Sequence, residues 1–277
     1  MLRRTFVASV IGFISTAIFD RARAQGLDFD ELLARLQSDD SLVEGMRSKS
    51  DDPEEVGLER APIRAPKSTT PISERGSDLI VTCEVSSKKL YEARYQIPTW
   101  PRGKSGVTIG IGYDVGYVTP QELERDWKEY IDAAVINALK PACGVTGSSA
   151  SAILRQIPAQ VVIPWSNAIS QFQNETRPRY VGETEKSLPN IGRLNADCLG
   201  ALVSVVYNRG ASFRKDGDRY QEMRSIRSHM SNHKFGAIPN EIRRMKRIWE
   251  EDPNMKGVLL RRDAEARLFE MGLQFLR

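Results

Sequence analysis

The chain has 277 residues, of which 40% are hydrophobic and 27% charged, and its formal net charge is +4. This length fits one large domain or two small ones, and the apolar content is sufficient for a core. The positive excess lies mostly in the first 24 residues, so the chain lacks the concentrated basic stripe of nucleic-acid-binding proteins, and we expect no nucleic-acid partner.

The amino-terminal residues have the three parts of an export signal. The basic start MLRR precedes the apolar run TFVASVIGFISTAIF, and small residues (ARA) precede Gln25. The apolar run is shorter than the ~20 residues that span a bilayer comfortably. We expect residues 1–24 to be a signal peptide, removed from a monomeric protein that is periplasmic or secreted and not stably inserted in the membrane. A permanent anchor is the alternative.

Residues 25–76 show weak patterning. LDFDELLARL favours one short helix, but the following stretch is rich in proline, serine and charge and poor in large apolar residues. Such a segment buries too little surface to offset the entropy lost on ordering. We expect residues 25–76 to be a largely disordered extension and linker, and residues 77–277 to form the globular domain.

The stretch 105–114, SGVTIGIGYD, alternates like a β-strand. One face carries Val107, Ile109, Ile111 and Tyr113, and the other carries Thr108, Gly110, Gly112 and Asp114. The two glycines of the second face would leave space for a ligand such as a sugar ring. A glycine-bearing hairpin without a ligand is the alternative.

Helical signals dominate after this strand. TPQE at 119–122 is a capping box with proline at the first helical position, and Pro141 should end the helix that follows. Residues 196–208 are apolar on nearly every face, which is typical of a buried helix, with Asn195 as its cap. Further helices are expected in VVIPWSNAISQFQNE, EIRRMKRIW and LLRRDAEARLFEMGLQFL. The expected fold is α+β, mainly α, with a small β-hairpin lobe and a larger helical lobe.

Cysteines and histidines indicate no catalytic or metal site. Cys83, Cys143 and Cys198 are too few for a disulfide scaffold, and both a Cys143–Cys198 bridge and buried free thiols remain open. His229 and His233 have the spacing of a metal-binding pair, but their surroundings are polar and lack the glutamate of the zinc-hydrolase motif. We expect surface histidines, no metal and no cofactor, which leaves carboxylates as the best catalytic candidates.

Glu84 is the first of these carboxylates. It lies in the apolar stretch LIVTCEV. Burial of a carboxylic acid favours its protonated form near neutral pH, as a general acid for glycoside cleavage requires. An exposed glutamate at the start of a helix is the alternative.

Four short motifs connect Glu84 to a known family. Tyr91 follows Glu84 by seven residues, and TIGIGYD (108–114), VVYNRG (205–210) and GVLLRRDAEARLF (257–269) come after it. In this order the motifs resemble the phage-type lysozymes and, more closely, the pesticin-like muramidase domain of exported bacterial proteins. The resemblance covers about residues 84–272. It implies a lysozyme-like two-lobed fold and cleavage of peptidoglycan glycan strands between N-acetylmuramic acid and N-acetylglucosamine.

The resemblance also implies roles for individual residues. Glu84 would protonate the leaving oxygen, while Thr108 and Asp114, at the pesticin-like spacing, would position or activate a water for inverting hydrolysis. Ordinary phage lysozymes have an aspartate between the glutamate and the threonine. This chain has none there, and Glu92 is the competing second carboxylate. The expected substrate-binding residues are Tyr91, Trp100, Gly110, Gly112 and Asn208. For Trp100, packing within its loop is an equal alternative, and Asn208 either caps its helix or faces the cleft.

Two further expectations follow. The carboxyl groups of an inverting glycosidase lie about 6.5–9.5 Å apart, whereas a straight strand would separate Thr108 from Asp114 by about 20 Å. We therefore predict a turn at Gly110 or Gly112 that brings Asp114 back towards Glu84. Arg261 or Arg262 with Glu265 should form an ion pair of the surface type. The rival functions are a non-catalytic peptidoglycan-binding protein and a lytic transglycosylase or chitinase-like enzyme.

Overall fold

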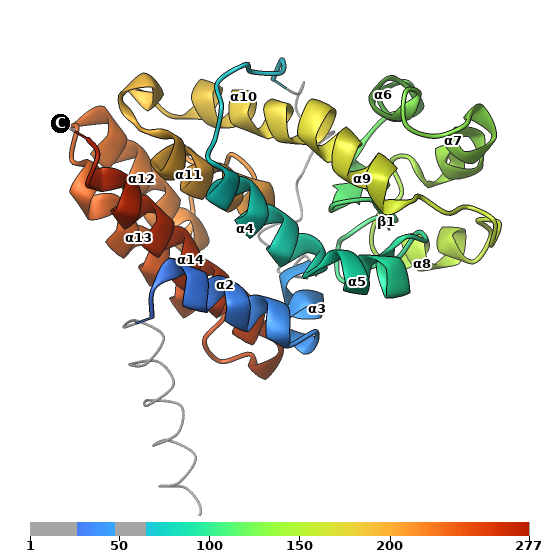
Figure 1. The fold of residues 1–277 in the computed structure, drawn as a ribbon, viewed down its shortest axis with the longest axis horizontal. Helices are drawn as coiled ribbons and strands as arrows, with labels where there is room; N and C mark the ends of the chain where they lie inside the picture. The colour runs from blue at the N-terminus through green and yellow to red at the C-terminus, as the bar shows by residue number, and fades with distance from the viewer. Residues whose placement is uncertain (1–26, 48–64, 277) are drawn as a thin grey trace, which may run out of the picture.

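The computed structural model describes residues 27–47 and 65–276 of the chain. These residues are mainly helical and include one two-stranded antiparallel sheet, so the α+β, mainly α class is confirmed (Figure 1). The α-helices and strands are α2 (Phe29–Ser38), α3 (Ser41–Arg47), α4 (Glu74–Val85), α5 (Lys88–Leu90), β1 (Thr108–Ile109), β2 (Tyr113–Asp114), α6 (Pro120–Trp127), α7 (Ala133–Leu139), α8 (Ser148–Leu154), α9 (Trp165–Gln171), α10 (Arg177–Ser187), α11 (Ala196–Arg209), α12 (Gln221–Ser231), α13 (Ile238–Arg244) and α14 (Lys256–Leu273). Two π-helical segments, η2 (Tyr91–Tyr95) and η5 (Phe172–Thr176), continue α5 and α9.

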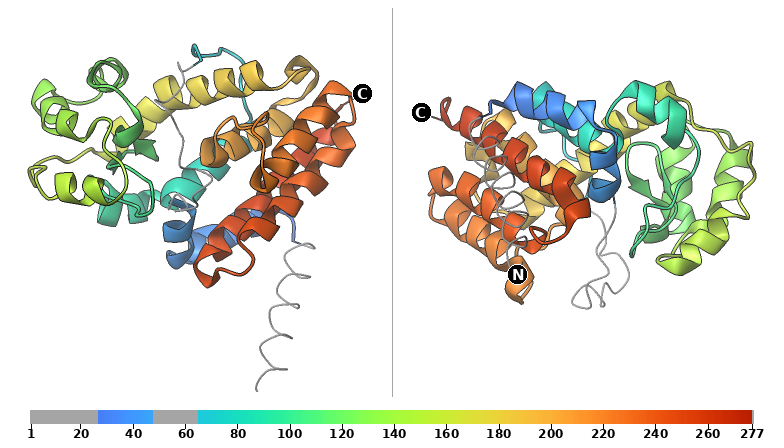
Figure 2. Two further views of the ribbon diagram at one scale, coloured as in Figure 1. Left: turned by 180° about the vertical axis from the view of Figure 1, so that it is seen from behind. Right: turned by 90° about the horizontal axis from the view of Figure 1, so that it is seen from below.

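The elements gather at two ends of the molecule. The hairpin and α5–α8 form one end, here called the hairpin end, and α2, α3 and α11–α14 form the other, here called the helical end (Figures 1 and 2). Helix α4 and the nearly continuous α9–η5–α10 run between them (Figure 1). Two segments far apart in sequence therefore join the ends.

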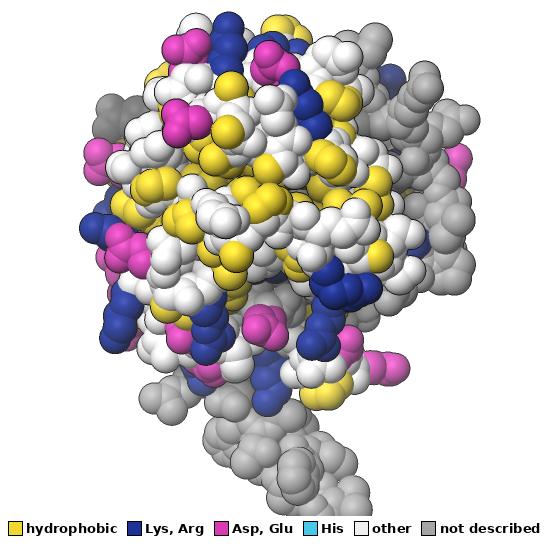
Figure 3. Space-filling view, turned by 90° about the vertical axis from the view of Figure 1, so that its right-hand side faces the viewer, with side chains coloured by type: hydrophobic (Ala, Val, Ile, Leu, Met, Phe, Trp, Pro, Cys, Tyr) yellow, Lys and Arg dark blue, Asp and Glu magenta, His cyan; other side chains and the backbone are white. Residues whose placement is uncertain are grey.

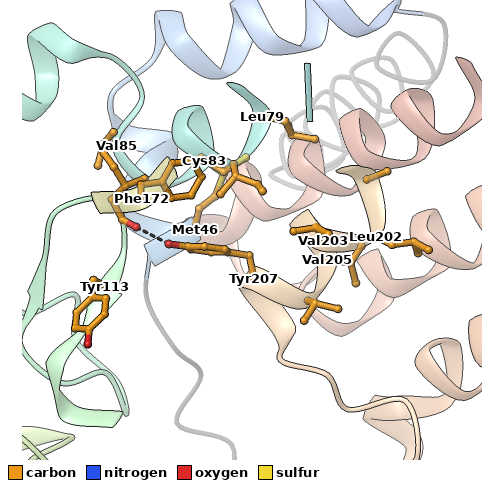
Figure 4. Packing of buried hydrophobic residues seen from close by; sticks show 14 of the residues in the cluster. Met46, Leu79, Cys83, Val85, Tyr113, Phe172, Leu202, Val203, Val205 and Tyr207 are labelled. Atoms are coloured by element: carbon orange, nitrogen blue, oxygen red, sulfur yellow. Dashed lines mark hydrogen bonds between the residues drawn. The ribbon is translucent and has the colours of Figure 1, made fainter. Parts of the chain in front are cut away.

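Helix α11 is the centre of the core. It packs on α14, α4 and α10, and its residues from Cys198 to Tyr207 are all buried, as its apolar pattern predicted. Asn195 caps it by accepting a hydrogen bond from the backbone N–H of Cys198. Glycines let α4 approach closely, because a Cβ on Gly76 would lie 2.8 Å from the Cα of Gly200. Figure 4 shows side chains of α4 and α11 packed in this core.

The segment 27–47 is part of the folded body, so the expectation of a largely disordered extension up to residue 76 is wrong for it. Helix α2 begins with a capping box between Asp28 and Glu31. Its apolar face is buried and packs against α14 and α4. The short amphipathic pattern of this segment did not by itself indicate a packed helix, but α14 and α4 provide the surface on which α2 buries its apolar face. The expected signal peptide (1–24) and the middle of the expected linker lie outside the described residues.

Residues 65–73 are also packed on the body. The backbone N–H of Ser68 donates to the carbonyl of Pro178, and the hydroxyl of Thr70 donates to Glu185. A Cβ on Gly182 would lie 2.1 Å from the carbonyl oxygen of Pro66, so this glycine is needed for the close approach. The folded unit therefore does not begin at residue 77.

The glycine-rich stretch forms a tight hairpin. Thr108 lies opposite Asp114 and Ile109 opposite Tyr113. Gly110 and Gly112 have φ angles of +56° and +68°, a conformation that favours glycine. The predicted turn at these glycines is confirmed. The apolar face of the stretch is buried, as its alternation predicted.

The hairpin end is small and leaves part of its apolar surface uncovered. Hydrophobic side chains gather on the face that lies over this end of the molecule (Figure 3). Ile97 and Val162 are 47% and 40% exposed. Because small units bury a smaller share of their surface, such a face is expected of short helices around one hairpin.

The helix expected over residues 119–141 is divided into two shorter helices. The capping box of Thr119 with Glu122 is present, but the helix ends at Trp127 and a second one, α7, follows.

All three cysteines are free, so no Cys143–Cys198 bridge forms. Burial raises the pKa of the Cys83 thiol to about 12, which keeps it neutral. Among the described residues, no helix has the length and apolarity needed to cross a membrane.

Candidate active site

Glu84 lies in the last turn of α4 and is only 7% exposed. Its Oε1 accepts a hydrogen bond from Nη1 of Arg261 at 3.1 Å. Arg261 is fully buried on α14 and also donates from Nε to Glu265 and from Nη2 to the carbonyl of Ser204. Glu84 is therefore a nearly buried carboxyl group at a helix end, held by a buried arginine.

The motif around Arg261 is a buried charge network. Arg261, Arg262 and Glu265 have no exposed surface, and Ser204 donates from its hydroxyl to Glu265 at 2.7 Å. The expectation of a surface ion pair is therefore wrong, because α14 packs along α11 and turns this face inward. Removing one partner from such a network costs about 3–5 kcal/mol, far more than breaking a surface pair.

The two arginines of this network differ in their electrostatics. Burial alone would lower the pKa of Arg261, but the neighbouring groups of Cys83, Glu265 and Glu84 hold it above its usual value. Burial lowers the pKa of Arg262 to about 10, although Glu265 opposes the shift. Arg261 therefore stays protonated and positively charged beside Glu84.

The hairpin turn lies directly against Glu84. A Cβ on Gly112 would lie 2.5 Å from Oε2 of Glu84, and a Cβ on Gly110 would lie 2.7 Å from Cη2 of Trp127. The space beside each glycine is thus filled by a side chain of the protein. The two glycines therefore admit Glu84 and Trp127 and shape the turn, and their expected role in substrate binding stays a prediction.

Thr108 and Asp114 lie opposite each other at the base of this hairpin. The hydroxyl of Thr108 donates to the carbonyl of Gly106 at 3.3 Å, and only 5% of the residue is exposed. Asp114 is partly exposed and accepts hydrogen bonds from the backbone N–H groups of Gly106 and Gly116. The structure thus brings Thr108 and Asp114 together beside the turn that contacts Glu84.

The aromatic candidates are fixed by the protein itself. Tyr91 is completely buried, its hydroxyl donates to the carbonyl of Ile163 at 2.8 Å, and its ring meets Trp165 edge-on. Tyr91 therefore has no exposed surface in this structure, and its expected contact with substrate stays a prediction. Trp100 is partly exposed and donates from Nε1 to the carbonyl of Ser105. It therefore has the packed-loop role that was the alternative for this residue.

Asn208 and Glu92 lie in different surroundings. Asn208 accepts from Nη2 of Arg262 at 2.8 Å and donates to the carbonyl of Met46, so it links α11, α14 and α3. Glu92 is exposed on η2, and its nearest cation is Lys88 at 3.6 Å. Asn208 is thus part of the frame beside the charge network, while Glu92 is a solvated surface group.

The structure adds two residues to the site that we did not anticipate. Tyr207, at the end of α11, donates its hydroxyl to the carbonyl of Ile111 in the hairpin turn (Figure 4). Arg47, at the end of α3, donates to the carbonyl of Glu84. Tyr207 belongs to the VVYNRG motif, which was a usable signal. Arg47 lies in the segment expected to be disordered, where the sequence offered no signal for a residue of the site.

The histidines lie apart from this site. His229 on α12 has its Nε2 3.7 Å from Glu241, and His233 follows the end of that helix. Within residues 27–47 and 65–276, no group of three or more histidine, cysteine, aspartate or glutamate side chains is arranged to hold a metal ion. No known family model and no curated protein matches this chain. The case for a function therefore depends on the motifs and on the geometry around Glu84.

Proposed function

We propose that the protein is a peptidoglycan hydrolase, a muramidase that cleaves the glycan strand between N-acetylmuramic acid and N-acetylglucosamine. One observation carries the proposal: motifs separated by more than 100 residues meet at a single carboxyl group. Glu84 is held by Arg261 and lies against a hairpin turn that pairs Thr108 with Asp114. A carboxylic acid and a second carboxylate on one glycosidic bond are the usual machinery of glycoside hydrolysis.

The proposal includes a lysozyme-like, two-lobed arrangement. The hairpin end and the helical end would flank the glycan, with Glu84 at the end of the helix that joins them (Figure 1). The proposed place of action is the periplasm or the outside of the cell, where this polymer occurs. For that location the support is the export-like pattern of residues 1–24.

In the proposed reaction Glu84 gives its proton to the leaving glycosidic oxygen. Its Oε1 is engaged by Arg261, so the proton would be carried by Oε2, the oxygen nearer to Gly112. Arg261 divides its charge between Glu84 and Glu265.

Asp114 and Thr108 would hold the attacking water. Asp114 is partly exposed, so water can reach its carboxylate beside Thr108. Water attack on the face opposite Glu84 would invert the anomeric carbon. This assignment keeps Asp114 ahead of Glu92, which lies exposed beside Lys88.

A specific observation supports a second candidate, a lytic transglycosylase or a related enzyme with one acid. Both oxygens of Asp114 accept from the backbone N–H of Gly106, which gives the carboxylate a structural role. A transglycosylase needs the acid but no carboxylate that activates water. A non-catalytic binding protein is the weaker alternative, because binding alone does not require a buried acid with its own arginine.

Mass spectrometry of digested peptidoglycan separates these functions. Products with reducing N-acetylmuramic acid ends indicate the proposed hydrolysis. Anhydro-muramic acid ends would indicate transglycosylation. Binding to the polymer without any product would indicate a binding protein and would overturn the proposal.

A further inference from the structure

Helix α3 is docked rigidly on the helical end. A Cβ on Gly45 would lie 2.2 Å from the carbonyl oxygen of Asn254, and a Cβ on Gly257 would lie 2.1 Å from that of Leu42. Two glycines, one on each partner, thus allow backbone-to-backbone contact of α3 with the turn at Pro253–Met255 and with the first residues of α14. The carbonyl of Met46 also accepts from Asn208 of α11. The end of α3 is therefore a fixed point relative to Arg261 and its network.

Arg47 extends from this fixed point to the hairpin end. Its Nη1 donates to the carbonyl oxygen of Glu84 at 3.0 Å, and its Nη2 donates to Oγ1 of Thr99 at 2.9 Å. The guanidinium lies 4.0 Å from the ring centroid of Tyr95. The residue is only 8% exposed. One buried guanidinium thus joins the end of α4 to the segment that precedes the hairpin.

The contact with Thr99 leads directly to the strand of the proposed site. The backbones of Thr99 and Thr108 exchange two hydrogen bonds, of 3.0 and 2.8 Å. Arg47 is therefore one residue removed from Thr108 and in direct contact with the backbone of Glu84.

We infer that Arg47 is a positioning residue: it fixes the backbone of Glu84 relative to the strand that carries Thr108. Glu84 is then held by two arginines, with Arg261 on its carboxylate and Arg47 on its carbonyl. Segment 27–47, which lies outside the region of resemblance, is in this view a working part of the site. The consequence for catalysis rests on the proposed function, whereas the mechanical link between the two segments does not.

The chemistry of arginine suits this role. The last carbonyls of a helix need partners outside the helix, and a cation there also interacts favourably with the helix dipole. The planar fork reaches two acceptors at once while its face stacks on Tyr95. Lysine has its three N–H donors on a single nitrogen and has no flat face, so it would keep the charge but not the spread of the two bonds or the stacking on Tyr95.

The test compares four variants of the full-length protein in steady-state digestion of peptidoglycan. Arg47→Met should lower kcat by about 100-fold, since misplacement of about 1 Å can cost that much, with KM nearly unchanged. Arg47→Lys should recover part of the loss, and Thr99→Val should show a smaller loss of kcat. The matched control is Arg243→Met, which removes a partly buried arginine–glutamate pair on α13 and α14 and should leave kcat unchanged.

Hydrogen exchange separates failure of this inference from failure of the proposed function. In Arg47→Met, amides near residues 84–87 and 99–108 should exchange faster in both segments together, and in Arg243→Met they should not. This result supports the mechanical link even if the wild-type protein releases no muropeptides. Unchanged exchange in both segments, or equal loss of kcat in the two arginine variants, would overturn the inference.

Discussion

Two buried ion networks among the described residues, one at the hairpin end and one at the helical end, differ in what they contact. At the hairpin end, Arg179 of α10 makes two hydrogen bonds to Asp126 of α6, which also accepts from the hydroxyl of Tyr113. At the helical end, Arg261 binds both Glu265 and Glu84. The first network reaches the hairpin through Tyr113 but binds no proposed catalytic side chain, whereas the second ends on the proposed catalytic acid. Under the proposed function, similar burial would serve stability in one case and catalysis in the other.

This comparison predicts the largest effect for Glu84 itself. Glu84→Gln keeps the shape of the side chain and its acceptor for Arg261 but removes the transferable proton. Activity should fall by about 10²–10⁴-fold or more, and the circular dichroism spectrum should show an intact fold. Substantial residual activity in a well-folded Glu84→Gln protein would remove Glu84 from the mechanism.

The second prediction contrasts the two networks directly. Glu265→Gln should lower both the free energy of unfolding and kcat, because Glu265 holds the arginine that holds Glu84. Asp126→Asn should lower the free energy of unfolding by about 3–5 kcal/mol and leave kcat of the folded fraction unchanged. Chemical denaturation with parallel assays measures both quantities. Loss of kcat in Asp126→Asn, at full folding, would contradict the distinction.

The hairpin-end network also predicts a pH dependence of stability. Burial alone would raise the pKa of Asp126, but the hydrogen bonds and charge of Arg179, with the Tyr113 hydroxyl, hold it below its usual value. A carboxylate with a lowered pKa stabilises the fold above its unfolded pKa, near 3.9, and the contribution is lost as pH falls through the folded pKa. The stability gap between wild type and Asp126→Asn should therefore narrow below about pH 4. A constant gap in acid denaturation would contradict this explanation.

The turn glycines provide a finer comparison. Gly112→Ala places a Cβ against Glu84, and Gly110→Ala places one against Trp127. Both have positive φ, so both should lose about 1–2 kcal/mol from backbone strain. Only Gly112→Ala should also lower kcat sharply. The control is Gly192→Ala, where a Cβ meets no atom within 4 Å. Equal kcat losses at positions 110 and 112 would show that the effect is general damage to the turn.

The smallest predicted effect is that of Glu92→Gln, at the carboxylate that competes with Asp114. Asp114→Asn should reduce kcat severely because Asp114 lies opposite Thr108, while Glu92→Gln should have little effect because Glu92 lies exposed beside Lys88. Steady-state kinetics of the two variants decides between them. If Glu92→Gln is the more damaging change, the assignment of Asp114 fails although the acid role of Glu84 survives.

Local signals in the sequence predicted the elements well. The capping box at Thr119, the cap at Asn195 and the turn at Gly110 and Gly112 all depend on residues close in sequence, and all are present. Contacts between residues that are distant in the sequence could not be predicted from these local signals. The sequence around Arg261 predicts a surface residue, and its burial depends on the packing of α14 on α11. The role of Arg47 depends on the position of α3 beside Glu84. The site is therefore only partly predictable, because several residues that hold Glu84 and the hairpin turn come from elements distant in the chain.

The central claim is that Glu84 acts as the acid in hydrolysis of the glycan strand. The most direct measurement is digestion of purified peptidoglycan in ¹⁸O-labelled water by wild type and Glu84→Gln, with mass spectrometry of the products. We predict one ¹⁸O atom at each new N-acetylmuramic acid reducing end with the wild type, and no such product with Glu84→Gln. Unlabelled anhydro ends, no products from the wild type, or equal labelling by both proteins would contradict the claim.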